Sequence, residues 1–287
     1  QICGWSSLLM GLVFFLYPHT GHEGVSSIFN NQNYNGMWLS ITLPFIIFQV
    51  INNKYLILKI SLFIILSLTI FFLLLTNSRN SLLSLLIIFL MILNKKKFIL
   101  MITPLLALIF LFREIVINLL INISNQYNFF PIKTFERIFS IDINNSPRVE
   151  IYSLSSKLIF ENPLLGWGTN TFKNVYKTYG GLYDAQHTHN IFLELAYNFG
   201  VPLAILLLIF FLVIIIKSIL RVYKFPSSKL FFDFNKIWIL CSLIIFVNYL
   251  NDITYYDGRI SIFTWIIFAG SASIFNGKRK DLKISDL

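Results

Sequence analysis

The 287-residue sequence has little charge and few side chains that carry reactive chemistry. Charged residues make up 13% of the chain, with 13 acidic against 23 basic residues, and there are only two cysteines and four histidines. Together with a hydrophobic content of 56% and a mean hydropathy of +0.72, this scarcity excludes an ordinary soluble domain and indicates a polytopic membrane protein. The positions of the few polar residues are therefore informative.

Apolar runs long enough to cross the hydrocarbon layer fill most of the chain. They predict an all-α fold, a polytopic helical bundle of about eight spans with one long outer loop that contains amphipathic helices. The predicted spans are 2–18, 37–51, 56–76, 80–93, 98–120, 190–216, 236–251 and 260–275. The predicted regions are transmembrane helices over 1–112, the outer loop over 113–189, transmembrane helices over 190–276 and a basic inner tail over 277–287. Because the chain starts at Gln1 inside an apolar segment, we expect it to be part of a longer protein.

The basic residues are distributed unequally between the two sides of the predicted bundle. The inner connections hold Lys54, Lys95, Lys96, Lys97, Lys217, Arg221, Lys224, Lys229, Lys236 and the tail. The short outer connections hold only Arg79 and Arg259. By the positive-inside bias, the long loop and all four histidines are therefore outside. This bias also accounts for the net charge of +10 and argues against nucleic-acid binding.

Cysteines and histidines are candidates for disulfides or metal sites. Cys3 and Cys241 fall near the inner ends of their spans, away from an oxidising exterior, so we predict packing residues and no disulfide. Metal ligands could come from His187 and His189 together with an outer-loop group formed by His19, His22 and Glu23. The spacing is not that of an HExxH motif, and solvated loop residues are the preferred interpretation. We therefore predict no metal and no cofactor.

Polar residues at the outer ends of the spans have both structural and functional interpretations. Asn33, in an asparagine-rich stretch, either helps to cap the second span or hydrogen-bonds sugar and phosphate oxygens. Arg79 either reaches the lipid headgroups or pairs with a diphosphate through parallel hydrogen bonds. Asp252 and Asp257 either bind an acceptor or, as we prefer, pair with Arg259.

A predicted amphipathic helix lies near the end of the outer loop. It begins at Ser146 and Pro147 and ends before Asn162, and we expect it at the membrane interface or on the bundle. Arg148 in its first turn opposes the helix dipole, which favours an anionic partner. The expected apolar face comprises Val149, Tyr152, Ile159 and Phe160. After a tight GWG turn at residues 166–168, four aromatic residues either anchor the loop at the headgroups, as we prefer, or stack on sugar rings: Phe172, Tyr176, Tyr179 and Tyr183.

The stretch DAQHTHNIFLELAYNFG, residues 184–200, joins the outer loop to an apolar helix. His189 is either a general base, a role that imidazole suits, or a helix-cap histidine. His187 either orients it or is merely adjacent. Asn190 is expected to cap the helix, and Glu194, one turn later on the same face, needs a partner if it is buried.

The order of these features resembles a known family. FNNQNYNGMWLSITLPF, NSRNSLL, PRVEIY, ENPLLGWGTNTF and HTHNIFLELAYNFGVP are similar to the sequence blocks of the O-antigen ligase and polymerase superfamily, over roughly residues 20–205. Leu203 stands where that family has a second glycine after the His-Asn pair.

The resemblance implies a GT-C-like, metal-independent glycosyltransferase in the bacterial inner membrane. It implies a donor glycan on undecaprenyl diphosphate, used at the periplasmic face, and a lipid A core, a carrier-linked glycan or a protein as acceptor. By the resemblance, His189 is the catalytic histidine, and Arg79 and Arg148 hold the diphosphate. His187, Asn190, Asn33, Glu194 and Arg259 are supporting candidates.

Three other functions compete with the ligase. A polymerase that joins lipid-linked repeat units uses the same donor, face and basic residues, and differs only in its acceptor. A transporter or flippase would show internal repeats and charges near the membrane midplane. The sequence has no such repeat and gathers its polar residues on one side. A non-catalytic membrane scaffold is the third alternative.

Overall fold

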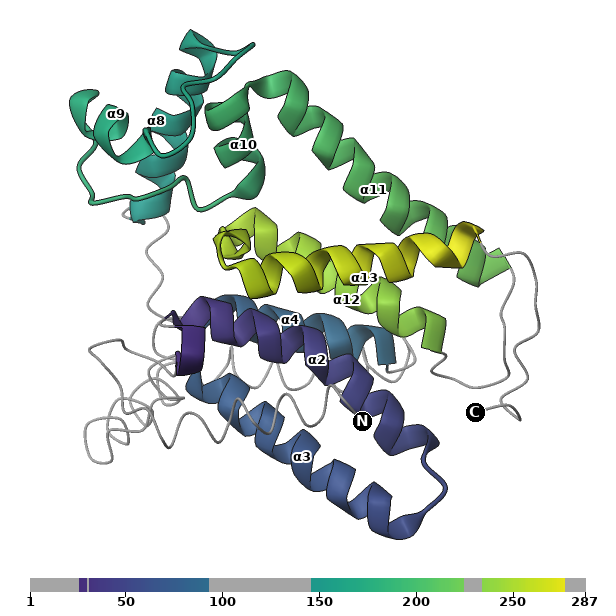
Figure 1. The fold of residues 1–287 in the computed structure, drawn as a ribbon. Helices are drawn as coiled ribbons and strands as arrows, with labels where there is room; N and C mark the ends of the chain where they lie inside the picture. Colours follow the sequence, from purple (N-terminus) through teal and green to yellow (C-terminus); the bar gives the residue numbers. More distant parts are fainter. Residues whose placement is uncertain (1–25, 30, 93–145, 225–233, 277–287) are drawn as a thin grey trace, which may run out of the picture.

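The computed structural model describes residues 26–29, 31–92, 146–224 and 234–276, and every regular element in these ranges is helical (Figure 1). The predicted spans 2–18 and 98–120 lie outside these residues, as do Cys3 and the outer-loop group His19, His22 and Glu23. In chain order the elements are η1 (Ser27–Phe29), α2 (Gln32–Asn52), α3 (Leu56–Leu75), α4 (Arg79–Ile92), α8 (Pro147–Glu161), α9 (Phe172–Thr178), α10 (Ile191–Phe199), α11 (Val201–Lys224), α12 (Phe234–Asn251), η2 (Thr254–Tyr256) and α13 (Gly258–Asn276). The predicted all-helical membrane fold is thus confirmed.

Four of the described helices, α2, α3, α11 and α12, are long and apolar enough to cross a membrane, and α4 and α13 contain shorter apolar stretches. Helices lie at the predicted spans 37–51, 56–76, 80–93, 236–251 and 260–275. The prediction of one span over 190–216 is wrong, because the chain turns at Gly200, whose φ of 91° interrupts the helix. Residues 191–199 form the separate helix α10, and the long apolar helix is α11.

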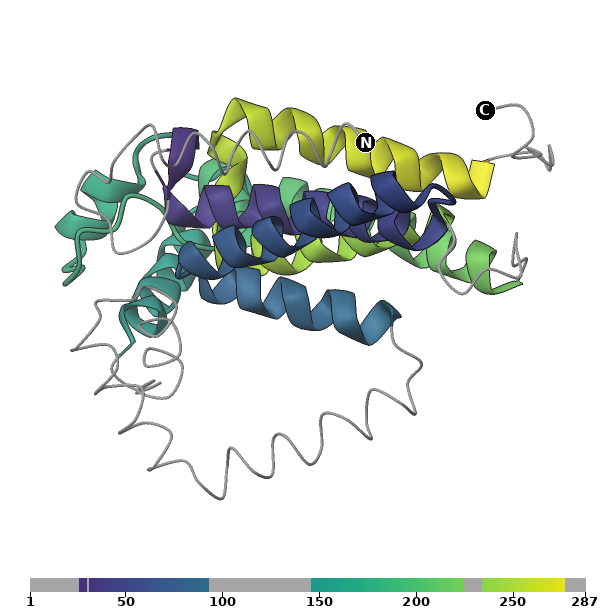
Figure 2. The same ribbon diagram turned by 90° about the horizontal axis from the view of Figure 1, so that it is seen from below.

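The apolar helices run side by side along one direction, and α8, α9 and α10 lie at one end of them (Figures 1 and 2). That end also holds η2, since η2 follows the last turn of α12. At the opposite end lie the α2–α3 turn and the C-terminal end of α11 (Figure 1), which carry Lys54, Lys217 and Arg221. These three residues, assigned to inner connections in the sequence, thus lie at the same end of the bundle.

Helix α12 occupies the centre of the bundle. It contacts α2, α4, α10, α11 and α13, and its buried side chains include Cys241, which packs in the core as predicted. Polar side chains link it to neighbours: Asn248 Nδ2 donates to Ser84 Oγ at 2.9 Å, and Ser242 Oγ lies 2.7 Å from Ser271 Oγ. Such short side chains allow close helix packing where apolar burial gives little drive for association.

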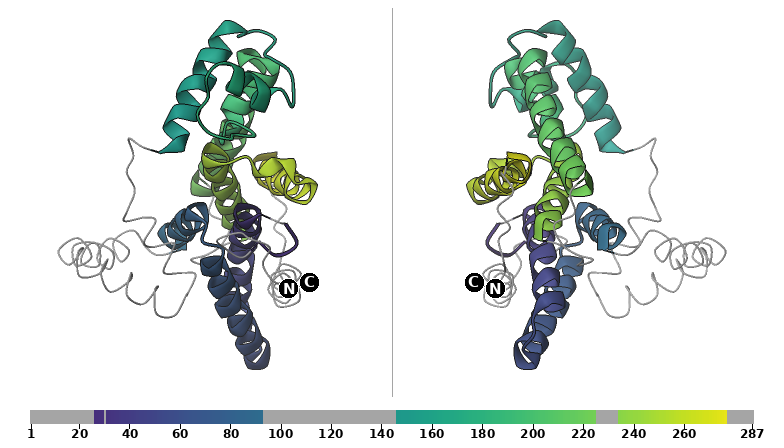
Figure 3. Two further views of the ribbon diagram at one scale, coloured as in Figure 1. Left: turned by 90° about the vertical axis from the view of Figure 1, so that its left-hand side faces the viewer. Right: turned by 90° about the vertical axis from the view of Figure 1, so that its right-hand side faces the viewer.

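Helices α8, α9 and α10 enclose a second, smaller core. Its buried residues include Ile151, Leu158, Phe172, Tyr176 and Tyr197. Figures 1 and 3 together show α8 running across the direction of the bundle helices, which is the orientation that a helix in the membrane interface takes.

The face that α8 buries differs from the predicted one. Ile159 is buried, but Val149 and Phe160 are 49% and 82% exposed. Ile151, Ser155 and Leu158 are the residues that face the core instead. Phe172 and Tyr176, predicted as anchors at the headgroups, are core residues. The tertiary contact with α10 selects this face, because the weak apolar periodicity of α8 does not define one.

Candidate active site

The loop that carries His187 and His189 is held by its own neighbours. His189 has a φ of 55°, a left-handed conformation that costs a non-glycine residue on the order of 1–2 kcal/mol. Three hydrogen bonds fix this conformation: Thr188 N–H donates to Glu194 Oε2 at 3.0 Å, Thr188 Oγ1 donates to the Asn190 carbonyl at 2.9 Å, and Tyr152 Oη donates to the His189 carbonyl at 3.2 Å. A strained residue held in this way is typical of a functional site.

Asn190 caps α10 and also joins it to the bundle. Its side-chain oxygen accepts from the N–H groups of Phe192 at 2.9 Å and Leu193 at 3.2 Å, which confirms the predicted cap. Its amide nitrogen donates to the carbonyl of Leu250 on α12 at 2.9 Å. The histidine loop is therefore fixed to the C-terminal end of the central helix.

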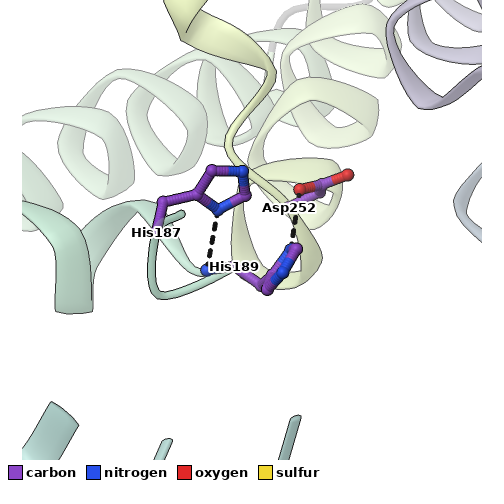
Figure 4. Close-up of side chains that lie close together, drawn as sticks. All are labelled: His187, His189 and Asp252. Carbon is purple, nitrogen blue, oxygen red and sulfur yellow. Dashed lines mark hydrogen bonds and ion pairs between the residues drawn. The ribbon is translucent and has the colours of Figure 1, made fainter. Parts of the chain in front are cut away.

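Asp252, the first residue after α12, is the partner of His189. Its carboxylate Oδ1 lies 3.3 Å from His189 Nδ1 and accepts from its own neighbour Ile253 N–H at 2.8 Å (Figure 4). Oδ2 accepts from Asn33 Nδ2 at 2.6 Å. The Asp252 side chain is 4% exposed, whereas that of His189 is 31% exposed. The dyad thus has a buried carboxylate and an imidazole that is open to a substrate.

The electrostatics of this pair favour an ionised carboxylate. Burial by itself would raise the pKa of Asp252. The hydrogen bond with His189, the charge of that ring and the Ile253 N–H outweigh burial and hold the pKa below its ordinary value. An ionised Asp252 accepts a hydrogen bond from the Nδ1–H group of His189, and this tautomer leaves Nε2 as the basic nitrogen.

His187 lies against His189, with ring centroids 4.3 Å apart. Its Nδ1 accepts from the His189 backbone N–H at 3.3 Å, and its other ring nitrogen points toward Asp252 in Figure 4. Burial, followed by the neighbouring His189, lowers the pKa of His187. His187 is therefore a neutral neighbour that orients the backbone of His189. Three residues could together hold a metal ion: His187, His189 and Asp252. Each offers one metal-ligand atom, and these atoms lie within 4.8 Å of one another.

Glu194 is buried, and its partners are hydrogen-bond donors. Besides Thr188 N–H, its carboxylate accepts from Asn198 Nδ2 at 3.2 Å and from Tyr256 Oη at 2.6 Å. Burial and the Glu194 carboxylate raise the pKa of Tyr256, so the phenol stays protonated and donates. The predicted need for a partner is thus met by neutral groups that tie the histidine loop to η2.

Burial and, after it, the positive charge of Arg148 lower the pKa of Arg79. Arg79 begins α4, Arg148 is in the first turn of α8, and the charge of Arg148 also acts on His187. Within the described ranges, neither guanidinium has a hydrogen-bond or carboxylate partner. Guanidinium groups pair well with anionic oxygens, so Arg79 and Arg148 are candidates for binding an anion.

Arg259, by contrast, is fully engaged by its neighbours. It pairs with Asp257 through contacts of 2.6 and 3.0 Å, donates to the Ile28 carbonyl at 3.2 Å and lies over the ring of Phe29. The Arg259 hydrogen bond lowers the pKa of Asp257. The predicted pairing is therefore confirmed for Asp257 and wrong for Asp252, which the sequence did not connect to His189.

The GWG turn, residues 166–168, packs against the C-terminal end of α10. The N–H groups of Trp167 and Gly168 donate to the carbonyls of Tyr197 and Asn198 at 2.7 and 3.1 Å. They thereby satisfy carbonyls that the C-terminus of α10 leaves free. Gly166 has a φ of 70°, and a Cβ on it would lie 2.5 Å from the Tyr197 carbonyl oxygen. The turn thus holds the helix that follows the histidines.

Asn31, not Asn33, caps α2, and its side-chain oxygen accepts from the Asn33 N–H at 2.8 Å. The contact of Asn33 with sugar or phosphate oxygens stays a prediction. The Asn33 side chain donates to Asp252 in the structure. Its partner lies 219 residues away in the chain, a separation at which no sequence pattern indicates a contact.

Comparison with known proteins covers part of this site. Residues 62–208 match the family model described as O-antigen ligase. The matched range is just over half of the chain, and it includes His187 and His189 as well as Arg79 and Arg148. A search of the curated proteins found no match.

Proposed function

The chain belongs to the O-antigen ligase family, and we propose that it transfers a glycan from undecaprenyl diphosphate to a hydroxyl of lipid A core. The observation that carries the proposal is the His189–Asp252 dyad together with Arg79 and Arg148, which have no hydrogen-bond or carboxylate partner among the described residues. Together these groups supply what transfer from a lipid diphosphate needs, which is a base for the acceptor and positive charge for the leaving group.

His189 takes the proton of the acceptor hydroxyl. Asp252 accepts a hydrogen bond from Nδ1–H, so Nε2 receives the proton from the hydroxyl as its oxygen attacks the anomeric carbon of the donor. The bond between that carbon and the diphosphate oxygen breaks, and its electron pair leaves with the lipid diphosphate. Asn33 and Ile253 N–H hold the carboxylate in place throughout.

Arg79 and Arg148 stabilise the negative charge that develops on the leaving diphosphate. The charge of Arg148 acts on Arg79, and negative charge on a bound diphosphate would offset this unfavourable interaction between like charges. Because guanidinium groups remain charged and donate two parallel hydrogen bonds, they perform this role without a metal.

The reaction takes place at the periplasmic face of the inner membrane. The site lies at the end of the bundle opposite Lys54, Lys217 and Arg221, which the positive-inside bias assigns to the cytoplasm (Figure 1).

Substitution of each group tests the proposal. The full-length protein carrying His189→Ala, or Arg79→Ala with Arg148→Ala, is expected to lose glycan transfer by at least a hundredfold while its amount in the membrane is unchanged. Lys157→Ala, which removes an exposed cation from the same helix as Arg148, is the matched control and retains transfer. Transfer at the wild-type rate by His189→Ala would refute the assignment of the base.

The products identify the acceptor. In a strain without the protein, a ligase defect leaves long glycan on its carrier and none on lipid A core. A polymerase defect leaves single repeat units attached instead. A gel of the extracted lipopolysaccharide separates these two patterns, and the second pattern would replace the ligase by the polymerase with the same donor and site.

A further inference from the structure

We propose that His187, His189 and Asp252 also bind a zinc-like transition-metal ion, and that this ion inhibits the enzyme. The inhibition rests on the proposed role of His189 as the base, whereas the binding rests on geometry alone. The three residues each offer one ligand atom, and these atoms lie within 4.8 Å of one another.

The separations suit a tetrahedral ion. Ligands at about 2.0–2.1 Å from zinc lie about 3.3 Å from each other. His189 Nδ1 and Asp252 Oδ1 are already 3.3 Å apart. Because Nδ1 of His187 accepts the His189 N–H, its free nitrogen is the one that points toward Asp252 in Figure 4. A small movement of the His187 ring therefore completes a three-ligand site.

The groups around the ligands hold them in place, as they do in protein metal sites. Asn33 Nδ2 and Ile253 N–H fix the carboxylate of Asp252. Tyr152 holds the carbonyl of His189, and Glu194 holds the N–H of Thr188 between the two histidines. The ion therefore binds to a carboxylate and a loop backbone that these hydrogen bonds already hold in place.

The donor set selects the kind of ion. Two imidazoles and one carboxylate suit zinc, nickel or copper, whereas magnesium and calcium take oxygen ligands. Among the described residues, the group of close His, Cys, Asp and Glu ligand atoms has three members, so a fourth position stays open. Three protein ligands with an open fourth position differ from the closed four-ligand arrangement of structural zinc sites.

The same ligands explain why the ion inhibits. An ion on His189 Nδ1 separates the ring from Asp252 and leaves the proton on Nε2, so the ring no longer accepts a proton from the acceptor. Substrate transfer and metal binding therefore exclude each other.

Direct binding of zinc tests the site. With purified full-length protein, competition against a chromophoric zinc chelator is expected to show one ion per chain. His187→Gln and, separately, Asp252→Asn are expected to weaken binding at least tenfold. Asp257→Asn, the matched control in the same connection, is expected to leave the affinity unchanged. Binding that survives both ligand substitutions would overturn the proposal.

The outer-loop histidines need a control of their own. The variant His19→Gln/His22→Gln removes the other pair that the sequence offers, and it is expected to retain zinc binding. Loss of binding in this variant, with full binding in His187→Gln, would move the site to the first outer loop.

Inhibition is measured with the same protein. Micromolar zinc is expected to lower glycan transfer at least tenfold, EDTA to restore it, and magnesium to have no effect. Stimulation of transfer by zinc would overturn the inhibitory role. If the chain transfers no glycan at all, the proposed function fails, while the chelator competition still decides whether the metal site exists.

Discussion

Asp252→Asn is the substitution that most directly tests the dyad. It removes the negative charge opposite His189 Nδ1 and changes the side chain by a single group. In one orientation, the new amide oxygen still faces His189, and the amide nitrogen meets Asn33 Nδ2 across the present 2.6 Å contact, so Asn33 must flip. In the other orientation, the amide nitrogen donates to Nδ1, which fixes the wrong tautomer and leaves no basic nitrogen for the acceptor.

The expected decrease in the transfer rate follows from these two orientations of the new amide. A hydrogen bond to a charged group contributes about 1.5–3 kcal/mol, so loss of the charge alone lowers the rate about 10- to 150-fold. The wrong tautomer lowers it by about 10⁴-fold in a comparable histidine–carboxylate pair of serine proteases. We therefore expect a decrease in kcat of at least tenfold. KM should change little, because Asp252 is buried behind the histidine and does not reach the substrate.

The assay is glycan transfer by full-length protein in lipid nanodiscs, with a lipid-linked donor and a purified acceptor. Asp257→Asn is the matched control, because that aspartate pairs with Arg259 instead of a histidine. A kcat of Asp252→Asn within twofold of the wild-type value would refute the dyad. A large increase in KM with unchanged kcat would instead place Asp252 in substrate binding.

Three further predictions concern the groups that support the site. Glu194→Gln should lower the free energy of unfolding, measured in detergent solution, by about 1–3 kcal/mol. The NH₂ group of the new amide must face one of the donors whose hydrogen bonds the carboxylate now accepts. Gly166→Ala should lower the melting temperature more than Gly168→Ala, since a Cβ at 166 meets the backbone of α10 at 2.5 Å and one at 168 meets nothing within 4 Å. The lowered pKa of Asp257 means that its pair with Arg259 stabilises the protein above the unfolded pKa of about 4 and ceases to do so as the pH falls through the folded value. Because Arg259 is 46% exposed, this contribution is at most about 1 kcal/mol, and the melting difference from Asp257→Asn should disappear at low pH.

The sequence predicted the helical membrane fold because apolar length is a local property. The spans around α2, α3, α12 and α13 are confirmed, since no contact with another helix is needed to define an apolar run. The break at Gly200 was missed, because the residues on both sides are apolar. A turn there depends on the backbone of Leu164, whose carbonyl lies 2.1 Å from where a Cβ of residue 200 would be.

Within the site, the sequence alone selected His189, Arg79 and Arg148, because basic groups are scarce in such a chain and because their surrounding motifs resemble those of a family. It also predicted the Asn190 cap, which depends only on the next few residues. The tertiary structure decided the rest. It placed Asp252 and Asn33 against the histidine and gave Glu194 its neutral partners, because these contacts join residues up to 219 positions apart that only the packing of α2, α10 and α12 brings together.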